Sequence, residues 1–193
     1  MKTKQGISRQ QIQFASLDNF IAVGQNVSSN TSLKSLTKLD GGLQGVGFTY
    51  EPRLSNKLTI DLSVGAGGGY DVYEGGVGYE WNIIQPAFYF SVTPKFFYNR
   101  KKRLEKARST KFNSGNYIGL RLKYTTPSVA PNDPLRDALL INLHWGLQRA
   151  IGKRWTFNTH IGGGYAQDLN SQFGTIYPAL DFKFSYIISN HKF

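Results

Sequence analysis

The sequence predicts an all-β fold, a single antiparallel up-and-down β-barrel that we expect to have eight strands. The first observation is composition: 21 glycines, 14% aromatic and only 18% charged residues are typical of strands and tight turns. The second is a period-2 alternation of apolar and polar residues, which sorts side chains onto the two faces of a sheet. The third is the length of 193 residues, which suits one domain, so residues 1–193 are predicted to form a single barrel domain.

The alternation defines the predicted strands. It is clearest near the C-terminus, where Leu180, Phe182 and Phe184 share one face and Asp181 and Lys183 the other. Counting back from the C-terminus gives seven such segments: 175–189, 154–166, 138–149, 115–126, 82–98, 57–70 and 42–51. Because single-chain bacterial barrels have an even number of strands, an eighth is expected within 12–28, where the alternation is weak.

The polar face indicates what surrounds the barrel. A water-soluble barrel covers its exterior with Lys and Glu, whereas this face is mostly Gly, Ser, Thr, Asn and Gln with scattered charges of both signs. Such residues fit the narrow interior of an eight-stranded barrel. The apolar face then contacts lipid, and the fold is predicted to be transmembrane. Aromatic residues on that face are predicted to form girdles at the membrane interfaces: Tyr50, Tyr70, Tyr98, Tyr124, Trp145, Trp155, Tyr165 and Tyr186.

Two stretches resemble a known family. Residues 96–120, reading FFYNRKKRLEKARSTKFNSGNYIGL, and 145–149, reading WGLQR, are similar to the small, porin-family-like outer-membrane β-barrel proteins of Bacteroidota. The terminal Phe193 also resembles the aromatic end of outer-membrane barrels. The resemblance covers about residues 42–189 and implies a Gram-negative outer-membrane location and a fold, but no active site. No apolar signal segment follows Met1, so this location presumes that a signal peptide has been removed.

Each strand of an up-and-down barrel crosses the membrane once, so successive connections lie at alternate ends of the barrel. We expect residues 52–56, 99–113 and 150–153 and both termini on the periplasmic side, with residues 1–11 as a disordered N-terminus. Extracellular loops are expected at 28–41, 71–80, 127–137 and 167–174, and the first three are the predicted contact surfaces.

The connection at 99–113 is strongly basic and is predicted to form a short helical turn. It holds seven Lys or Arg against one acid, Glu105. Because no aromatic residues interleave with these charges, we expect lipid phosphates or acidic partners there rather than nucleic acid. The predicted basic periplasmic turn consists of Arg100, Lys101, Lys102, Arg103, Lys106, Arg108 and Lys111.

Charged and imidazole side chains are predicted to point into the barrel and to form a salt-bridged plug, because charges enclosed in a low dielectric must be paired. The lumen-facing candidates are Asp61, Lys95, Arg121, Lys123, His144, His160, Asp181 and Lys183. A three-residue loop at the Ala150–Lys153 turn places His144 directly opposite His160. Such a pair could bind a metal, sense pH or act as a base, but a structural pair is favoured. The chain has no cysteine, which excludes disulfides and thiolate metal sites. No other metal site and no cofactor is predicted.

These features predict a structural or accessory component of the outer membrane with a plugged lumen, rather than an open porin. The expected partners are outer-membrane lipids, with other outer-membrane or periplasmic proteins as further candidates, and no nucleic acid. Two alternatives remain open: a lipid-modifying outer-membrane enzyme, for which no catalytic residue is identified, and a soluble lipocalin-like carrier of an apolar ligand. The glycine-rich stretches 65–69 and 162–164 are interpreted as close packing inside strands, not as phosphate loops.

Overall fold

The computed structural model describes residues 32–81, 84–129, 135 and 137–191. The described residues from Leu33 onward belong to one compact unit, which consists almost entirely of strands. Within the described part of the chain, no helix is long and apolar enough to cross a membrane.

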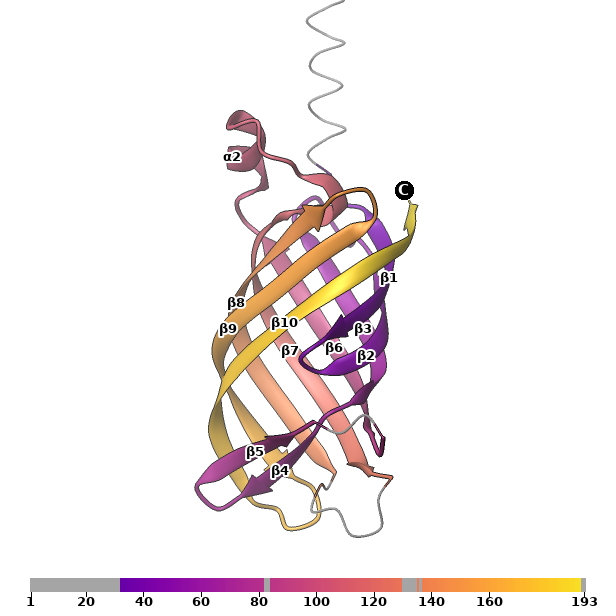
Figure 1. The fold of residues 1–193 in the computed structure, drawn as a ribbon. Helices are drawn as coiled ribbons and strands as arrows, with labels where there is room; N and C mark the ends of the chain where they lie inside the picture. The colour runs from indigo at the N-terminus through magenta and orange to yellow at the C-terminus, as the bar shows by residue number, and fades with distance from the viewer. Residues whose placement is uncertain (1–31, 82–83, 130–134, 136, 192–193) are drawn as a thin grey trace, which may run out of the picture. The chain divides into compact units, whose positions relative to one another are not determined.

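Eight strands close into a barrel (Figure 1). In chain order they are β1 Ser35–Gly42, β2 Gly45–Glu51, β3 Leu58–Gly67, β6 Ala87–Phe97, β7 Gly115–Ser128, β8 Ala138–Ile151, β9 Trp155–Asp168 and β10 Gly174–His191. The order around the barrel is β1-β10-β9-β8-β7-β6-β3-β2, with antiparallel pairing throughout. The predicted all-β, eight-stranded antiparallel barrel is therefore confirmed.

The expected position of the first strand is wrong. Residues 12–28 and the predicted N-terminal segment 1–11 lie outside the described residues, and the barrel closes through β1, within the stretch 28–41 predicted as an extracellular loop. Alternation failed there because Leu36 points inward while Leu39 points outward and is 54% exposed. The two leucines are three residues apart, so a regular strand puts them on opposite faces and neither face is uniformly apolar.

The two faces of the wall differ in polarity as the alternation predicts. On β7, Ile118, Leu120 and Leu122 are between 46% and 49% exposed, whereas Lys123, the next residue, is buried. Large apolar residues are exposed on all of the longer strands, among them Phe88, Phe90, Leu143, Ile161, Leu180, Phe182 and Phe184. The outside of the barrel is therefore apolar and the inside polar.

The segment 71–80, predicted as a loop, forms a β-hairpin instead. Its strands are β4 Gly69–Tyr73 and β5 Gly76–Glu80, and Gly75 supplies a positive φ of 88° at the turn. The predicted strands 57–70 and 82–98 are correspondingly shorter, because β3 ends at Gly67 and β6 begins at Ala87. Tyr70 is buried rather than lipid-facing, because the chain leaves the wall after Gly67.

The β4–β5 hairpin packs on the inner surface of the wall. Tyr70 and Val72 form an apolar cluster with Ala138 and Leu140 of β8 and Ala166 of β9. Figure 1 shows the hairpin at the end of the barrel opposite the helix α2. The interior is therefore apolar at this end, whereas it is charged in the middle.

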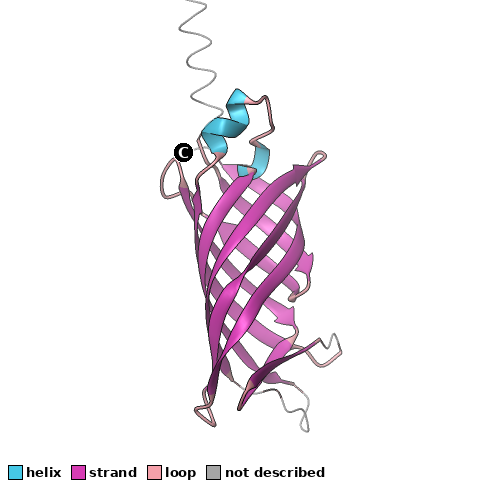
Figure 2. Cartoon of the chain, turned by 90° about the vertical axis from the view of Figure 1, so that its left-hand side faces the viewer, coloured by secondary structure: helices cyan, strands magenta, loops and turns pink. Residues whose placement is uncertain are grey.

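Helical turns occupy the other rim (Figure 2). The predicted helical turn in the basic connection is present as α2, Arg100–Glu105, and is followed by the 3-10 turn η1, Lys111–Asn113. Phe112 of η1 is buried against Leu36 and Ile187. Asn113 is buried as well, and its side-chain amide donates to Glu51 Oε1 at 2.9 Å.

The predicted register between β8 and β9 is wrong by two residues. His144 lies opposite Gly162, and His160 lies opposite Gly146. The reason is the turn: β8 continues to Ile151, which pairs with Trp155, and Gly152 adopts a positive φ of 62°. A shift of two residues preserves the faces, so the two imidazoles become diagonal neighbours.

Close packing across this pair of strands explains two glycines. A Cβ on Gly162 would lie 2.6 Å from His144 Cα and closer still to the Leu143 carbonyl oxygen. A Cβ on Gly164 would likewise lie too close to the Ile141 carbonyl oxygen, whereas one on Gly163 would meet nothing within 4 Å. The interpretation of residues 162–164 as close packing therefore holds for Gly162 and Gly164 but not for Gly163.

We expect Gly162→Ala to lower the free energy of unfolding by about 1–3 kcal/mol, the typical cost of overpacking. Gly163→Ala is the matched control and should be neutral or stabilising by about 0.4–1 kcal/mol, because alanine restricts the unfolded chain. Urea unfolding followed by tryptophan fluorescence measures both. Equal midpoints for the two variants would contradict the close approach of β8 to Gly162.

Candidate functional site

The first part of the site is a cluster of ion pairs in the middle of the barrel. Lys38 Nζ lies 2.7 Å from Glu51 Oε2 and 3.6 Å from Asp61 Oδ2. Lys95 Nζ forms an ion pair with the same Asp61 oxygen. All four side chains are almost completely buried. The cluster joins four strands, because Lys38 is on β1, Glu51 on β2, Asp61 on β3 and Lys95 on β6.

Lys183 of β10 connects this cluster to the last strand. Its Nζ lies 2.6 Å from Asp40 Oδ2 and 3.9 Å from Asp61 Oδ2. Thr49 donates to Asp40 Oδ2 at 2.5 Å and lies 2.7 Å from Ser63 Oγ. The Lys183–Asp40 pair crosses the seam where β1 meets β10, so the network ties the first strand of the barrel to the last.

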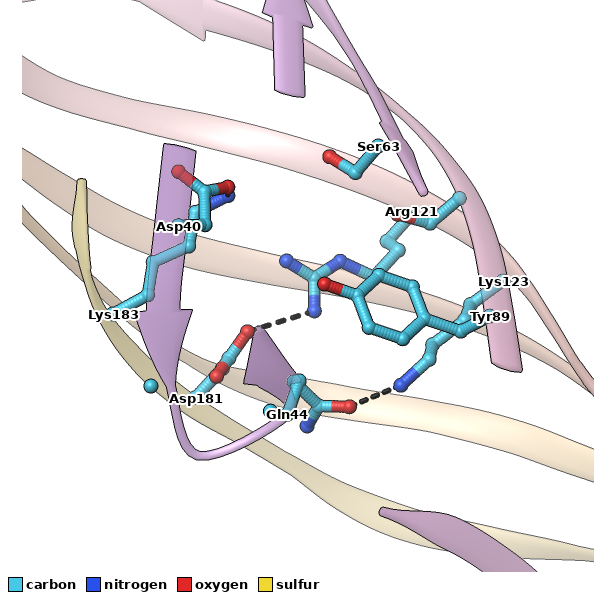
Figure 3. Close-up of a pocket in the computed structure, with 11 residues that line it drawn as sticks. Asp40, Gln44, Ser63, Tyr89, Arg121, Lys123, Asp181 and Lys183 are labelled. Atoms are coloured by element: carbon cyan, nitrogen blue, oxygen red, sulfur yellow. Dashed lines mark hydrogen bonds and ion pairs between the residues drawn. The ribbon is translucent and has the colours of Figure 1, made fainter. Parts of the chain in front are cut away.

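A second group of charges lies nearer the β4–β5 hairpin (Figure 3). Arg121 donates to Asp181 Oδ2 at 3.0 Å. Lys123 is buried, and its ammonium donates to Gln44 Oε1. It also lies over two aromatic rings, 4.8 Å from the centroid of Tyr70 and 4.7 Å from that of Tyr89. Among the described residues, no carboxylate lies within 4 Å of the Lys123 ammonium.

The two histidines stack inside the barrel although they are not directly opposite each other. Their ring centroids are 4.0 Å apart with an interplanar angle of 26°. His144 Nδ1 donates to Asn142 Oδ1 at 2.7 Å, and the Tyr117 ring meets His144 edge-on. No carboxylate is hydrogen-bonded to either ring within the described structure. The two rings therefore pack against each other, and His144 also packs against Tyr117.

Polar side chains continue the network towards η1. Gln148 accepts from Lys95 Nζ at 3.2 Å and from Asn158 Nδ2 at 3.0 Å, and it donates to the Phe112 carbonyl oxygen at 2.9 Å. Tyr117 in turn donates to Asn158 Oδ1 at 2.8 Å. The interior is therefore occupied by mutually bonded side chains from the ion-pair cluster to the rim that carries η1.

The structure places the lumen-facing candidates as follows. Asp61, Lys95, Lys123, His144, His160 and Asp181 are buried, and the side chains of Arg121 and Lys183 are 14% exposed. They form three groups: Asp61, Lys95 and Lys183; then Arg121, Asp181 and the adjacent Lys123; and the stacked histidines. Sequence reasoning missed Lys38, Asp40 and Glu51. Lys38 and Asp40 lie two residues apart, as same-face residues of a strand do, but they were assigned to a loop.

The girdle residues lie towards the two ends of the barrel. Tyr50, Tyr98, Trp145 and Trp155 are 38–49% exposed and, with the half-buried Tyr186, lie towards the rim that carries α2. Tyr124 and Tyr165 are also exposed and lie towards the other end. Trp145 Nε1 donates to the Tyr98 hydroxyl at 2.7 Å, and Trp155 meets Tyr186 edge-on.

The basic turn is only partly a solvated surface. Arg100 is buried and donates to the carbonyl oxygens of Thr110 and Ser114, each at 3.4 Å. Burial lowers the pKa of its guanidinium to about 10, which leaves it charged at neutral pH. Lys101 is exposed, whereas four other cations of this region line a pocket beside Tyr98: Lys102, Arg103, Lys106 and Arg108. Arg149 of β8 completes the pocket, and no acidic residue lines it.

No group of three or more His, Asp or Glu side chains in the described part of the chain is arranged to hold a metal ion. Comparison with known proteins adds little. No protein-family model and no curated protein matches the sequence. One solved structure with a similar chain path is the solid-state NMR structure of outer membrane protein AlkL in DMPC lipid bilayers. The alignment covers 83% of this chain and 90% of that one, with 8% sequence identity and a TM-score of 0.35. Values of this size establish no relationship.

We expect Asp61→Asn to destabilise the barrel by about 3–5 kcal/mol, because it leaves Lys38 and Lys95 buried with too little negative charge. Adding Lys95→Met to Asp61→Asn should recover part of that loss. Glu74→Gln, at the exposed tip of the β4–β5 hairpin, is the matched control and should change stability by less than about 0.5 kcal/mol. The stability of all three variants is measured by urea titration, with the folded and unfolded bands separated on a gel. An unchanged urea midpoint for Asp61→Asn would show that the ion-pair network does not stabilise the barrel.

Proposed function

We propose that this chain is an integral β-barrel of a bacterial outer membrane and serves as a structural or accessory membrane component rather than an open porin. The observation that carries the proposal is the polarity of the wall, which has its charged side chains inside and its large apolar side chains outside. This distribution is the reverse of the one expected for a water-soluble barrel.

The apolar exterior supports the membrane location. Outward residues on neighbouring strands form a continuous exposed belt, exemplified by Phe96, Ile118, Trp145, Ile161 and Leu180, which are paired in sequence across β6 to β10. Soluble monomers rarely expose apolar patches larger than a few hundred Å². Where its strands are paired, the barrel also satisfies the backbone hydrogen bonds that lipid cannot.

The filled interior supports a barrel that is closed to general solutes. Ion pairs occupy the middle, and the ends carry further packing: the β4–β5 hairpin at one and Phe112 of η1 at the other. Eight strands leave a bore that side chains alone can fill. Passage of a hydrated solute would require the paired charges to separate.

The two alternative functions have less support. A lipocalin-like carrier needs an apolar cavity, whereas Lys38, Asp61 and Lys95 occupy the middle of this interior. A lipid-modifying enzyme needs a catalytic group that reaches lipid, whereas His144 and His160 are buried inside. Membership of the small, porin-family-like barrels of Bacteroidota is also a proposal, supported by the resemblance of residues 96–120 and 145–149.

The membrane location is tested by folding the urea-unfolded chain into phosphatidylcholine vesicles and following its heat-modifiable gel mobility. Leu120→Arg should reduce the free energy of folding into the bilayer by about 2–4 kcal/mol, because a lipid-facing charge near the midplane has no partner. Leu54→Arg is the matched control: Leu54 is also exposed, but it lies in the connection between β2 and β3. Leu54→Arg should change the free energy of folding into the bilayer by no more than about 1 kcal/mol.

Two outcomes would contradict the proposal. Equal effects of Leu120→Arg and Leu54→Arg would mean that the belt does not face hydrocarbon. Stepwise ion conductance of the reconstituted wild-type chain across a planar bilayer would mean that the lumen is open.

We further propose that lipid phosphate groups are partners of the basic turn. The pocket lined by Lys102, Arg103, Lys106, Arg108 and Arg149 adjoins the Tyr98–Trp145 pair of the girdle. Amphipathic rings favour the interface between hydrocarbon and headgroups, so the cations beside them would stand at headgroup level. A basic group near an anionic membrane surface contributes about 1 kcal/mol.

Replacing Lys102 and Lys106 together with Gln should weaken binding of short-chain phosphatidylglycerol by roughly 30-fold at low salt, at about 1 kcal/mol for each charge. Lys57→Gln with Lys153→Gln removes two exposed cations outside the pocket and is the control. Isothermal titration of the protein in neutral detergent measures the affinity. If both double variants lose the same affinity for phosphatidylglycerol, the effect comes from the net charge of the protein and not from the pocket.

A further inference from the structure

The wall of the barrel has a gap beside β10. β1 and β2 have eight and seven residues, whereas β10 has eighteen. Pairing of β1 with β10 ends at Gly42 and Lys183, and a hydrogen bond from Leu43 N to Phe182 O extends it by one step. In the described chain, residues 174–181 of β10 therefore pair only with β9. Figure 1 shows the short β1–β2 hairpin ending partway along β10.

The β4–β5 hairpin borders this gap without pairing with β10. Its Tyr79 hydroxyl donates to the Leu43 carbonyl oxygen at 2.5 Å, and its Tyr70 hydroxyl donates to Gln44 Oε1 at 3.1 Å. A pocket of about 210 Å³ remains between the hairpin, the β1–β2 turn and β10. Its apolar and aromatic lining comes from Leu43, Tyr70, Val77, Tyr79, Tyr177 and Leu180.

The outer edge of this pocket is continuous with the apolar exterior. Leu180 both lines the pocket and is 55% exposed on the outer face. Ile176 and Val46, on the two strands that flank the gap, are 83% and 66% exposed. A molecule dissolved in the surrounding hydrocarbon would therefore reach the pocket without crossing a polar surface.

The inner edge of the same pocket leads to a cation. Gln44 lines both this pocket and a smaller interior one that contains Arg121 and Lys123 (Figure 3). Arg121 and Lys183 in that interior pocket are each paired with an aspartate, whereas Lys123 has the amide oxygen of Gln44 and two aromatic rings. Among the cations of this pocket, Lys123 is thus the one whose ammonium has no described carboxylate within 4 Å.

The sizes of the two pockets restrict the ligand. The interior pocket has a volume of about 20 Å³, enough for a water-sized group, so an incoming head group must displace the Gln44 amide from Lys123. The outer pocket, at about 210 Å³, is smaller than the roughly 300–1,000 Å³ of sites that enclose a whole drug-sized ligand. It fits the first part of a chain whose remainder stays in the bilayer.

We propose that this gap is a binding site for a single-chain amphiphile with an anionic head group, which enters sideways from the membrane. The carboxylate or phosphate head pairs with Lys123 in place of Gln44, and the first part of the chain lies among Tyr70, Val77 and Leu180. The inference rests on the proposed membrane location and adds a ligand class to it.

The test uses the full chain in phosphatidylcholine nanodiscs and a hexadecanoic acid that carries a diazirine near its carboxylate. Photolabelling should concentrate on peptides that contain Tyr70, Val77 and residues 174–182. Dodecanoate and dodecyl phosphate should compete, and the preferred one identifies the head group. Dodecanol should compete at least tenfold more weakly, because it brings no negative charge to Lys123.

Two variants probe the two parts of the site. Lys123→Met keeps the aliphatic stem and removes the charge, so it should weaken photolabelling at least tenfold. Competition by dodecanol should be unchanged in this variant, because dodecanol carries no negative charge. Val77→Trp should block the chain site with Lys123 intact. Leu120→Trp is the matched control, because it adds the same ring to the exposed face of β7 away from the pocket, and it should label as the wild type does.

The inference is overturned if labelling is spread evenly around the outer belt, or if Lys123→Met and Val77→Trp both label as the wild type does. Heat-modifiable mobility of each nanodisc sample reports folding separately. If the chain fails to insert into nanodiscs, the proposed membrane location fails. If it inserts and the pocket is not labelled, this inference alone fails.

Discussion

Charges enclosed in a narrow, closed barrel must be paired, and the rest of this structure depends on that constraint. Lys38, Glu51, Asp61 and Lys95 form one cluster, and Lys183 with Asp40 extends it across the seam between the first and last strands. Removing two charges from water costs several kcal/mol per ion, so the pairs persist only while their strands remain in register. The network therefore holds β1, a strand with little apolar alternation of its own, against β10.

The same constraint separates the functions of the two faces. Since the interior is committed to polar packing, the large apolar side chains have only the outer face, and hydrocarbon is the environment that suits them. The ends of the interior are filled differently, by an apolar hairpin at one rim and by η1 at the other. Between the hairpin and the short first strands, the wall is incomplete beside β10, and Gln44, the hydrogen-bond partner of Lys123, lines the pocket that remains there.

Much of the fold was predictable because alternation is a local property. The seven segments with regular alternation all became barrel strands, and the even strand number was correct although the eighth strand was misplaced. Its inward Lys38 and Asp40 gain their partners Glu51 and Lys183 only when β2 and β10 pair with β1. Likewise, the eight interior candidates were predicted as one set, but their division into ion pairs and a histidine stack required the register between strands.

The sequence by itself determined which side chains share a face, because successive residues of a strand point to opposite sides whatever the neighbouring strands do. It therefore determined the all-β class and the contrast between an apolar and a polar surface. Only the tertiary structure decided which residues meet. The turn after Ile151 sets the histidine contact, the departure of the chain at Gly67 turns Tyr70 inward, and the shortness of β1 and β2 opens the wall beside β10. Each of these depends on where strands begin and end relative to one another, and a local alternation does not contain that information.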